Sequence, residues 1–143
     1  MILTTLLLLT NLAFAAPTKD IVLDCIDGDT IKTQTLGKVR ILGIDTYDSK
    51  NTRMIEKQMK QNNLSKEEVV KLAKQGSKFC EDTLKGREVV LKSDHSDKDV
   101  FHRNLRYVYI DNQDYSELIL KTNLAKPYCK DKKIIKYSKY GCK

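Results

Sequence analysis

Near its start the sequence reads Asp27-Gly28-Asp29-Thr30, between two runs that are typical of β-strands. The run before it, residues 21–26, is apolar, and the run after it, residues 30–35, alternates and is rich in β-branched side chains. Because glycine accepts backbone angles that other residues resist, we expect Gly28 to lie in a turn or bulge. A third, more buried strand is predicted over residues 39–44. The first part of the chain is therefore predicted to be a β-meander with acidic residues at its turns.

The middle of the chain contains one strong helix signal. Ser65 and Glu68 form a capping-box pattern, in which each side chain caps a backbone N–H group of the other residue. Apolar residues then repeat at helical spacing over residues 69–84, and Gly86 suits a left-handed helix C-cap. The preceding residues 51–61 carry only a weak apolar stripe, which is compatible with a short helix or a mobile insertion.

The remaining elements complete a recognisable order. Strands are expected over residues 87–92 and 103–110, and Asp114 is expected to cap a second helix that runs to Leu120. Three strands, a helix, two strands and a helix is the order of an OB-fold. We therefore predict a mainly β protein with some α structure: an OB-fold five-stranded barrel with two to three helices, in one domain over residues 20–143. Fold alone does not establish function.

The first fifteen residues are apolar and uncharged, and they end in Ala13-Phe14-Ala15. This stretch is too short to span a bilayer as a stable helix, and its last three residues fit a signal-peptidase site. The sequence thus predicts a signal peptide over residues 1–15 and export to the periplasm or to the medium. The alternative is a buried N-terminal strand or helix.

Four cysteines follow that segment, and an even number in a small exported domain is typical of disulfides. Four cysteines allow three connectivities, which the sequence does not separate. We favour a disulfide between Cys129 and Cys142 at the lysine-rich C-terminus. Cys25 and Cys80 would then join the first strand to the main helix. Zinc is the competing interpretation, but there is no Cys-x-x-Cys pair and the two histidines lack zinc-finger spacing. The candidates are Cys25, Cys80, Cys129 and Cys142.

Charge and the acidic turns together indicate a class of chemistry. The formal net charge of +7 favours nucleic acid, anionic lipid or acidic glycan as a partner, although it also serves plain solubility. Asp27, Asp29 and Asp45 are expected at the ends of adjacent strands, together with Arg40. Clustered carboxylates suit a hard cation and an arginine suits a phosphate, so phosphoryl chemistry is indicated.

With these motifs the chain resembles the thermonuclease (staphylococcal-nuclease-like) family, over residues 21–128. Asp-Gly-Asp-Thr alone is a weak signal, and its spacing to the later motifs makes the resemblance more specific. The resemblance implies an OB-fold, calcium-dependent hydrolysis of phosphodiester bonds in DNA and RNA to 3′-phosphate ends, no stable protein partner, and a monomer. The motifs that carry it are Asp27-Gly28-Asp29-Thr30, Arg40, Asp45-Thr46, Arg103 and Asn123-Leu124-Ala125-Lys126.

The resemblance also implies roles for residues at matching positions. Asp29 and Asp45 would be direct calcium ligands, the backbone carbonyl of Thr46 would help, and Asp27 would lie near the metal. Calcium does bind several oxygens from carboxylates, carbonyls and water in flexible geometry.

Other positions would contact the substrate. Arg40 and Arg103 would hold the scissile phosphate, since the planar guanidinium binds phosphate oxygens bidentately and stays charged. Asp48 would orient the attacking water as the general base. Tyr128 and Phe101 would contact nucleotides, Tyr128 by stacking on a base, although Tyr128 could equally be a barrel-edge residue.

The chain departs from the family pattern at several positions. The family usually reads Asp-Thr-Pro-Glu, where this chain has Tyr47 and the shorter Asp48 in the last two places. If Asp48 reaches its water poorly, Asp48→Glu should raise the turnover rate; an unchanged or lower rate would mean that the loop has adapted. Residues 49–64 are longer than expected for the family and adjoin the site. Phe101 and His102 stand where Tyr-Gly is common.

Each site residue also has an ordinary explanation. Asp27-Gly28-Asp29 could be a simple hairpin turn, and Asp45 could end a strand. Arg40 could extend from a barrel strand into solvent, and Arg103 could be one more basic surface residue. The alternative function is a non-catalytic OB-fold module that binds nucleic acid through phosphate contacts. A structural cell-envelope protein would explain the charge but not the acidic cluster.

Overall fold

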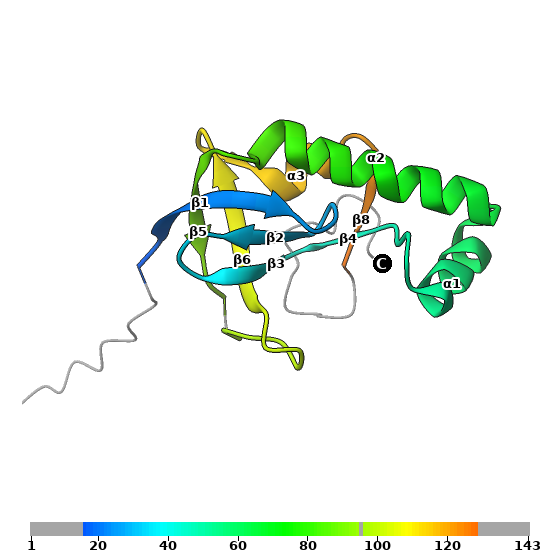
Figure 1. Ribbon diagram of the computed structural model, residues 1–143, viewed down its shortest axis with the longest axis horizontal. Coiled ribbons are helices and arrows are strands. Elements are labelled where there is room, and N and C mark those ends of the chain that lie inside the picture. The colour runs from blue at the N-terminus through cyan, green and yellow to red at the C-terminus, as the bar shows by residue number, and fades with distance from the viewer. Residues whose placement is uncertain (1–15, 95, 129–143) are drawn as a thin grey trace, which may run out of the picture.

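Five strands close into a small barrel in the computed structural model, which describes residues 16–94 and 96–128 (Figure 1). Antiparallel pairs join each strand to the next, and a parallel pair between β3 and β6 closes the ring. This closure removes the exposed edges that an open sheet would leave. The barrel strands are β1 (Thr18–Cys25), β2 (Thr30–Thr33), β3 (Gly37–Ile41), β5 (Glu88–Lys92) and β6 (Asn104–Ile110).

Two shorter pairings attach further segments to the barrel. The two-residue strand β7 (Gln113–Asp114) pairs antiparallel with the end of β6. The strand β4 (Ile44–Thr46) pairs with β8 (Ala125–Pro127) in a separate two-stranded sheet. The pairing with β8 brings the end of β4, where Asp45 and Thr46 lie, next to a segment from much later in the chain.

Three helices occur in the described part of the chain: α1 (Thr52–Asn62), α2 (Lys66–Leu84) and α3 (Tyr115–Leu120). The long helix α2 runs along one side of the barrel, and α1 folds back beneath its far end (Figure 1). Ser65 and Glu68 form the capping box at the start of α2, Gly86 follows it with φ +78°, and Asp114 caps α3, as the sequence predicted.

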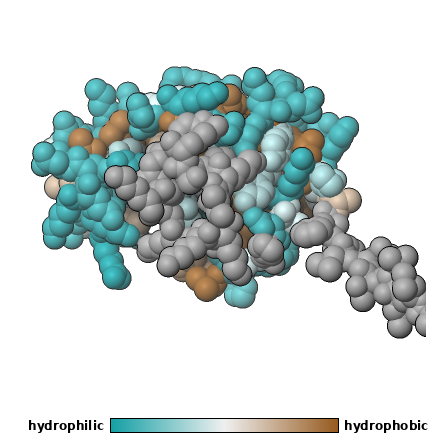
Figure 2. Space-filling model, turned by 180° about the vertical axis from the view of Figure 1, so that it is seen from behind, coloured by the Kyte–Doolittle hydropathy of each residue, from teal (hydrophilic) through white to brown (hydrophobic). Residues whose placement is uncertain are grey.

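Two apolar clusters stabilise this arrangement. The main core fills the barrel and the space under α2 and α3, and it includes Ile31, Val108 and Tyr115. A smaller cluster contains Tyr47 and Ile55 and joins α1 to α2. On the side seen in Figure 2 the described surface is mostly hydrophilic, with only scattered apolar areas.

The predicted fold class is confirmed, and so is one disulfide. Cys25 at the end of β1 is bonded to Cys80 in α2. The other expected pair, Cys129 with Cys142, and the expected signal peptide over residues 1–15 lie outside the described residues. In the described part, no helix is long and apolar enough to cross a membrane.

The elements differ from the sequence prediction at the third strand and near the end of the described chain, and the structure decides one alternative that the sequence left open. The strand expected over residues 39–44 is interrupted by a turn at Leu42 and Gly43, where Gly43 has φ +87°, so β3 and β4 are separate. Of the two alternatives for residues 51–61, the structure has the helix α1. The strand β8 was not predicted, since its three residues end at Pro127 and show no strand-like alternation.

Candidate functional site

Asp29 links the start of β2 to the end of β4. Its buried carboxylate accepts hydrogen bonds from the Thr46 backbone N–H (2.9 Å) and hydroxyl (3.0 Å) at one oxygen, and from the Thr30 hydroxyl (2.9 Å) at the other. Burial alone would raise the pKa of Asp29, but the charge of Arg40 and these hydrogen bonds outweigh it and lower the pKa. Asp29 is therefore a carboxylate at neutral pH.

Arg40 lies between two carboxylates. Its Nη2 is 3.4 Å from Asp29 Oδ2 and 3.5 Å from Asp45 Oδ1, and it donates to the Ile44 carbonyl at 2.9 Å. Nη1 donates to the Ile41 carbonyl at 2.7 Å, and the side chain is only 13% exposed. The ring of Tyr128 lies 6.0 Å from the guanidinium carbon. The guanidinium is thus fixed by the turn between β3 and β4, and its charge is shared by the two acids.

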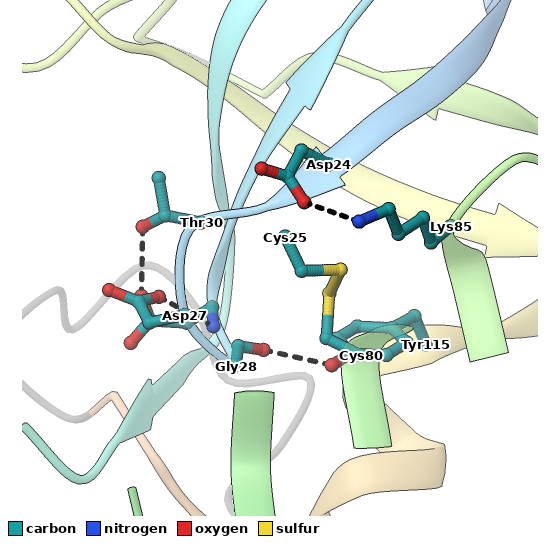
Figure 3. The surroundings of a disulfide bond; sticks show 9 residues. Asp24, Cys25, Asp27, Gly28, Thr30, Cys80, Lys85 and Tyr115 are labelled. Atoms are coloured by element: carbon teal, nitrogen blue, oxygen red, sulfur yellow. Dashed lines mark hydrogen bonds and ion pairs between the residues drawn. A yellow bond between two sulfur atoms is a disulfide. The ribbon is translucent and has the colours of Figure 1, made fainter. Parts of the chain in front are cut away.

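The cluster carries more negative charge than Arg40 balances. Burial, followed by the charge of Asp29, raises the pKa of Asp27 to about 7. The same two causes raise the pKa of Asp45, although 42% of its side chain is exposed and solvent moderates the effect. Asp27 also accepts a hydrogen bond from the Asp29 backbone N–H at 3.0 Å, as part of the loop drawn in Figure 3. A bound cation would relieve this repulsion.

Asp48 is turned toward its own loop. Its Oδ1 accepts hydrogen bonds from the backbone N–H groups of Lys50 (2.8 Å) and Asn51 (2.7 Å). Its own backbone N–H donates to the side chain of Gln58 at 2.8 Å. The short aspartate side chain therefore fits a turn that leads into α1, which favours the view that this loop is adapted to aspartate.

Arg103 and Phe101 form a second group at the start of β6. Arg103 Nε donates to Asp99 Oδ2 at 2.7 Å, and Asp99 Oδ1 accepts from the backbone N–H groups of Arg103 and Phe101. The Phe101 ring is 74% exposed and lies 5.4 Å from the Arg103 guanidinium carbon. His102 between them has φ +60°. This loop presents a cation and an aromatic ring side by side.

The structure thus brings most predicted site residues into two groups. One group has Arg40 in contact with Asp29, Asp45 and Tyr128, with Thr46 bonded to Asp29. The other has Arg103 with Phe101, and it is close to the first because β6 pairs with β3 in parallel, with Leu105 opposite Arg40. Within residues 16–94 and 96–128, no three His, Cys, Asp or Glu side chains are grouped tightly enough to hold a metal by themselves.

Three residues that support the site were not predicted. Gln58 bonds the loop of Thr46 and Asp48, Asp99 holds Arg103, and the buried Tyr115 hydroxyl donates to the Gly28 carbonyl at 2.9 Å (Figure 3). Gln58 follows Ile55 by three residues, so helical spacing in residues 51–61 could have placed it on the buried face. The partner of Tyr115, the Gly28 carbonyl, lies far away in the sequence, and Asp99 meets Arg103 in an irregular loop. No sequence pattern indicates either contact.

Comparison with protein families agrees with this geometry. The model of the staphylococcal nuclease homologue family matches residues 38–141, which is most of the chain. The chain belongs to this family. A search of curated proteins found no match. The family match contains Arg40, Asp45, Asp48 and Arg103 but begins after Asp27 and Asp29. Asp29 contacts the matched residues Arg40 and Thr46, and Asp27 contacts Asp29.

Proposed function

We propose that this protein is an exported, calcium-dependent nuclease that hydrolyses phosphodiester bonds of DNA and RNA to 3′-phosphate ends. Family membership supports phosphodiester hydrolysis, and nuclease homologues are typically calcium-dependent. The observation that carries the proposal is the cluster of Asp29, Arg40 and Asp45, in which acidic and basic groups needed for such chemistry are within 3.5 Å of each other. The Cys25–Cys80 disulfide supports a location outside the reducing cytoplasm.

The residues at the cluster fit calcium. They offer only oxygen donors, namely the carboxylates of Asp29 and Asp45 and the carbonyl of Thr46, with Asp27 nearby as a further negative charge. Two carboxylates and a carbonyl, completed by water, suit a hard cation that accepts flexible geometry. Bound calcium would supply positive charge that stabilises the anionic transition state and lowers the pKa of bound water.

The chain's own residues would bind the phosphate and direct water to it. Arg40 and Arg103 would face the scissile phosphate from adjacent strands and stabilise the charge that develops on its oxygens. Asp48 would orient a water whose oxygen forms a bond to phosphorus while the bond to the 5′-oxygen breaks. The proton lost by water ends on the departing 5′-oxygen, which leaves a 3′-phosphate and a 5′-hydroxyl. Phe101 and Tyr128 offer exposed rings for bases.

The test uses the oxidised protein without residues 1–15 and three substrates: single-stranded DNA, duplex DNA and RNA. We expect cleavage with calcium, no cleavage with EGTA, and 3′-phosphate ends on the products. Asp29→Asn should abolish cleavage, whereas the matched control Asp82→Asn, an exposed aspartate on α2 paired with Lys78, should not change it. Activity that persists in EGTA would contradict the calcium assignment.

One observation favours the alternative, a non-catalytic module that binds nucleic acid. Arg40 and Asp48 are both engaged by the protein itself, Arg40 by carbonyls and acids and Asp48 by backbone N–H groups. Such a module would bind single-stranded DNA with steep salt dependence and would not cleave it with any divalent cation. Binding without cleavage under calcium, magnesium and manganese would favour this alternative.

A further inference from the structure

The side-chain amide of Gln58 is buried and uses both of its polar atoms on the loop between β4 and α1. Its Nε2 donates to the Thr46 carbonyl at 3.1 Å, and its Oε1 accepts from the Asp48 backbone N–H at 2.8 Å. Gln58 is 6% exposed, which is unusual for a glutamine. The two bonds fix the orientation of the amide, because one partner can only accept and the other can only donate.

These bonds hold a segment that is otherwise irregular. Between the two bonded backbone groups lies Tyr47, which is nearly buried in the cluster that contains Ile55 and joins α1 to α2. The peptide groups on both sides of Tyr47 are therefore tied to the same helix that packs against its ring. A side chain lost from the middle of α1 would release both peptide groups at once.

Asp48 is also hydrogen-bonded to the residues that begin the same helix. Asp48 accepts from the backbone N–H groups of Lys50 and Asn51, and the Asn51 side chain caps α1 by accepting from the Met54 N–H at 3.3 Å. Gln58 then returns from α1 to the Asp48 backbone. The placement of Asp48 thus depends on the placement of α1: Gln58 bonds the Asp48 backbone N–H directly, and the first residues before α1 hold its carboxylate.

We propose that Gln58 is a positioning residue for the nuclease reaction. It acts by fixing the Thr46 carbonyl and the Asp48 backbone N–H, the two peptide groups on either side of Tyr47. The Asp48 carboxylate is thereby placed through its own backbone. A carbonyl oxygen has two lone pairs, so the bond from Gln58 leaves one on Thr46 for a cation. The assignment rests on the proposed function, because it places Gln58 behind two groups that the reaction uses.

The test compares Gln58→Met with two controls in the full chain. Methionine keeps the length and volume of the side chain but removes both hydrogen bonds. Gln61→Met makes the same change at an exposed position of α1. Ile55→Val weakens the packing of the same buried face without touching the amide. Unfolding by urea, steady-state cleavage of single-stranded DNA with calcium, and hydrogen exchange of the Asp48 amide are measured for each variant.

We expect Gln58→Met to lower kcat by roughly 10- to 100-fold, since misplacement of a reacting group by about 1 Å has effects of this size. KM for DNA should stay within about twofold, because the phosphate-binding arginines are untouched. Exchange of the Asp48 amide should become at least about tenfold faster in Gln58→Met alone. Ile55→Val should keep the kcat of the wild type even where it matches Gln58→Met in stability.

Two results would overturn the proposal. If Ile55→Val lowers kcat as far as Gln58→Met does, or if Gln58→Met keeps the kcat of the wild type, Gln58 has only a structural role. A wild-type protein that does not cleave with calcium would instead overturn the proposed nuclease function. In that case the exchange rate of the Asp48 amide, which needs neither calcium nor substrate, still decides whether Gln58 holds the loop.

Discussion

Asp48 holds its own loop, and under the proposed function the same side chain would also orient the attacking water. One carboxylate oxygen accepts two backbone N–H groups, a geometry that matches the short reach of aspartate. Asp48→Asn keeps an oxygen for these bonds but removes the charge. We expect kcat to fall by about 10²–10⁴-fold, the usual contribution of a general base, with little change in the midpoint of thermal unfolding. Cleavage assays and calorimetry on the same samples would check this, and an unchanged kcat would remove Asp48 from the mechanism.

Glutamate at position 48, which is longer by one methylene, tests whether the loop is adapted to aspartate. In Asp48→Glu the extra methylene moves the carboxylate past Lys50 and Asn51, so the turn loses two hydrogen bonds. We therefore expect a lower turnover rate than in the wild type, by about tenfold, and faster hydrogen exchange at those two amides. A higher turnover rate would instead mean that Asp48 reaches its water poorly.

At the residue level the sequence located the acidic cluster because its members lie within one stretch of neighbouring strands. Asp29, Arg40 and Asp45 belong to consecutive strand ends, and short connections keep such ends together. Gln58 and Asp99 could not be predicted in the same way. Most of their partners are backbone groups in irregular loops or at a strand end, whose positions depend on tertiary packing.

At the level of elements, the hairpin of β2 and β3 depends on a side chain of β1. Asp20 is buried and accepts hydrogen bonds from the backbone N–H groups of Ile21 (2.8 Å), Thr35 (3.0 Å) and Leu36 (3.2 Å). Asp20→Ala leaves donors of the turn unsatisfied and should lower the free energy of unfolding by about 2 kcal/mol at pH 7. Urea unfolding measures it, and Asp24→Ala, an exposed change on the same strand, is the control and should have little effect.

The same carboxylate predicts a dependence of stability on pH. Burial alone would raise the pKa of Asp20, but hydrogen bonds from the Thr33 side chain and from the backbone outweigh it and lower the pKa below the model-compound value of 3.8. A lowered pKa stabilises the folded state above the unfolded-state pKa, and this contribution is lost as pH falls through the folded-state pKa. The stability difference between wild type and Asp20→Ala should therefore be constant near neutral pH and shrink below about pH 4. A difference that grows in acid would contradict the assignment.

The elements that were predicted correctly are those with strong local signals. The capping box of α2 and the run of β-branched residues in β2 depend on residues close together in the chain, so the sequence alone indicates them. The break between β3 and β4 depends on the left-handed backbone of Gly43. The short strand β8 depends on a partner strand about eighty residues away, with Asp45 opposite Lys126. Long-range pairing of three-residue strands leaves almost no local pattern.

At the level of the whole molecule, the disulfide joins the barrel to its main helix just before the acidic loop. Cys25 and Cys80 are separated by 55 residues, and a cross-link that closes a loop of this length should stabilise the protein by about 4 kcal/mol if loss of chain entropy in the unfolded state is the cause. The double variant Cys25→Ala/Cys80→Ala should unfold at correspondingly lower guanidinium concentration. The double variant Cys129→Ala/Cys142→Ala removes the other expected pair, which would close a much shorter loop and should therefore cost less stability. An unchanged unfolding midpoint in Cys25→Ala/Cys80→Ala would contradict the stabilisation by the described bond.

Activity should respond less than stability to this change, because the acidic loop has a second attachment. The Tyr115 hydroxyl of α3 holds the Gly28 carbonyl (Figure 3). Asp29 is bonded to Thr46, so neither contact needs the disulfide. Well below its unfolding temperature the Cys25→Ala/Cys80→Ala variant should therefore cleave DNA within about threefold of the wild-type rate, since intact hydrogen bonds still place the reacting groups. A folded variant that has lost cleavage would show that the cross-link itself, rather than Tyr115, positions Asp27 and Asp29.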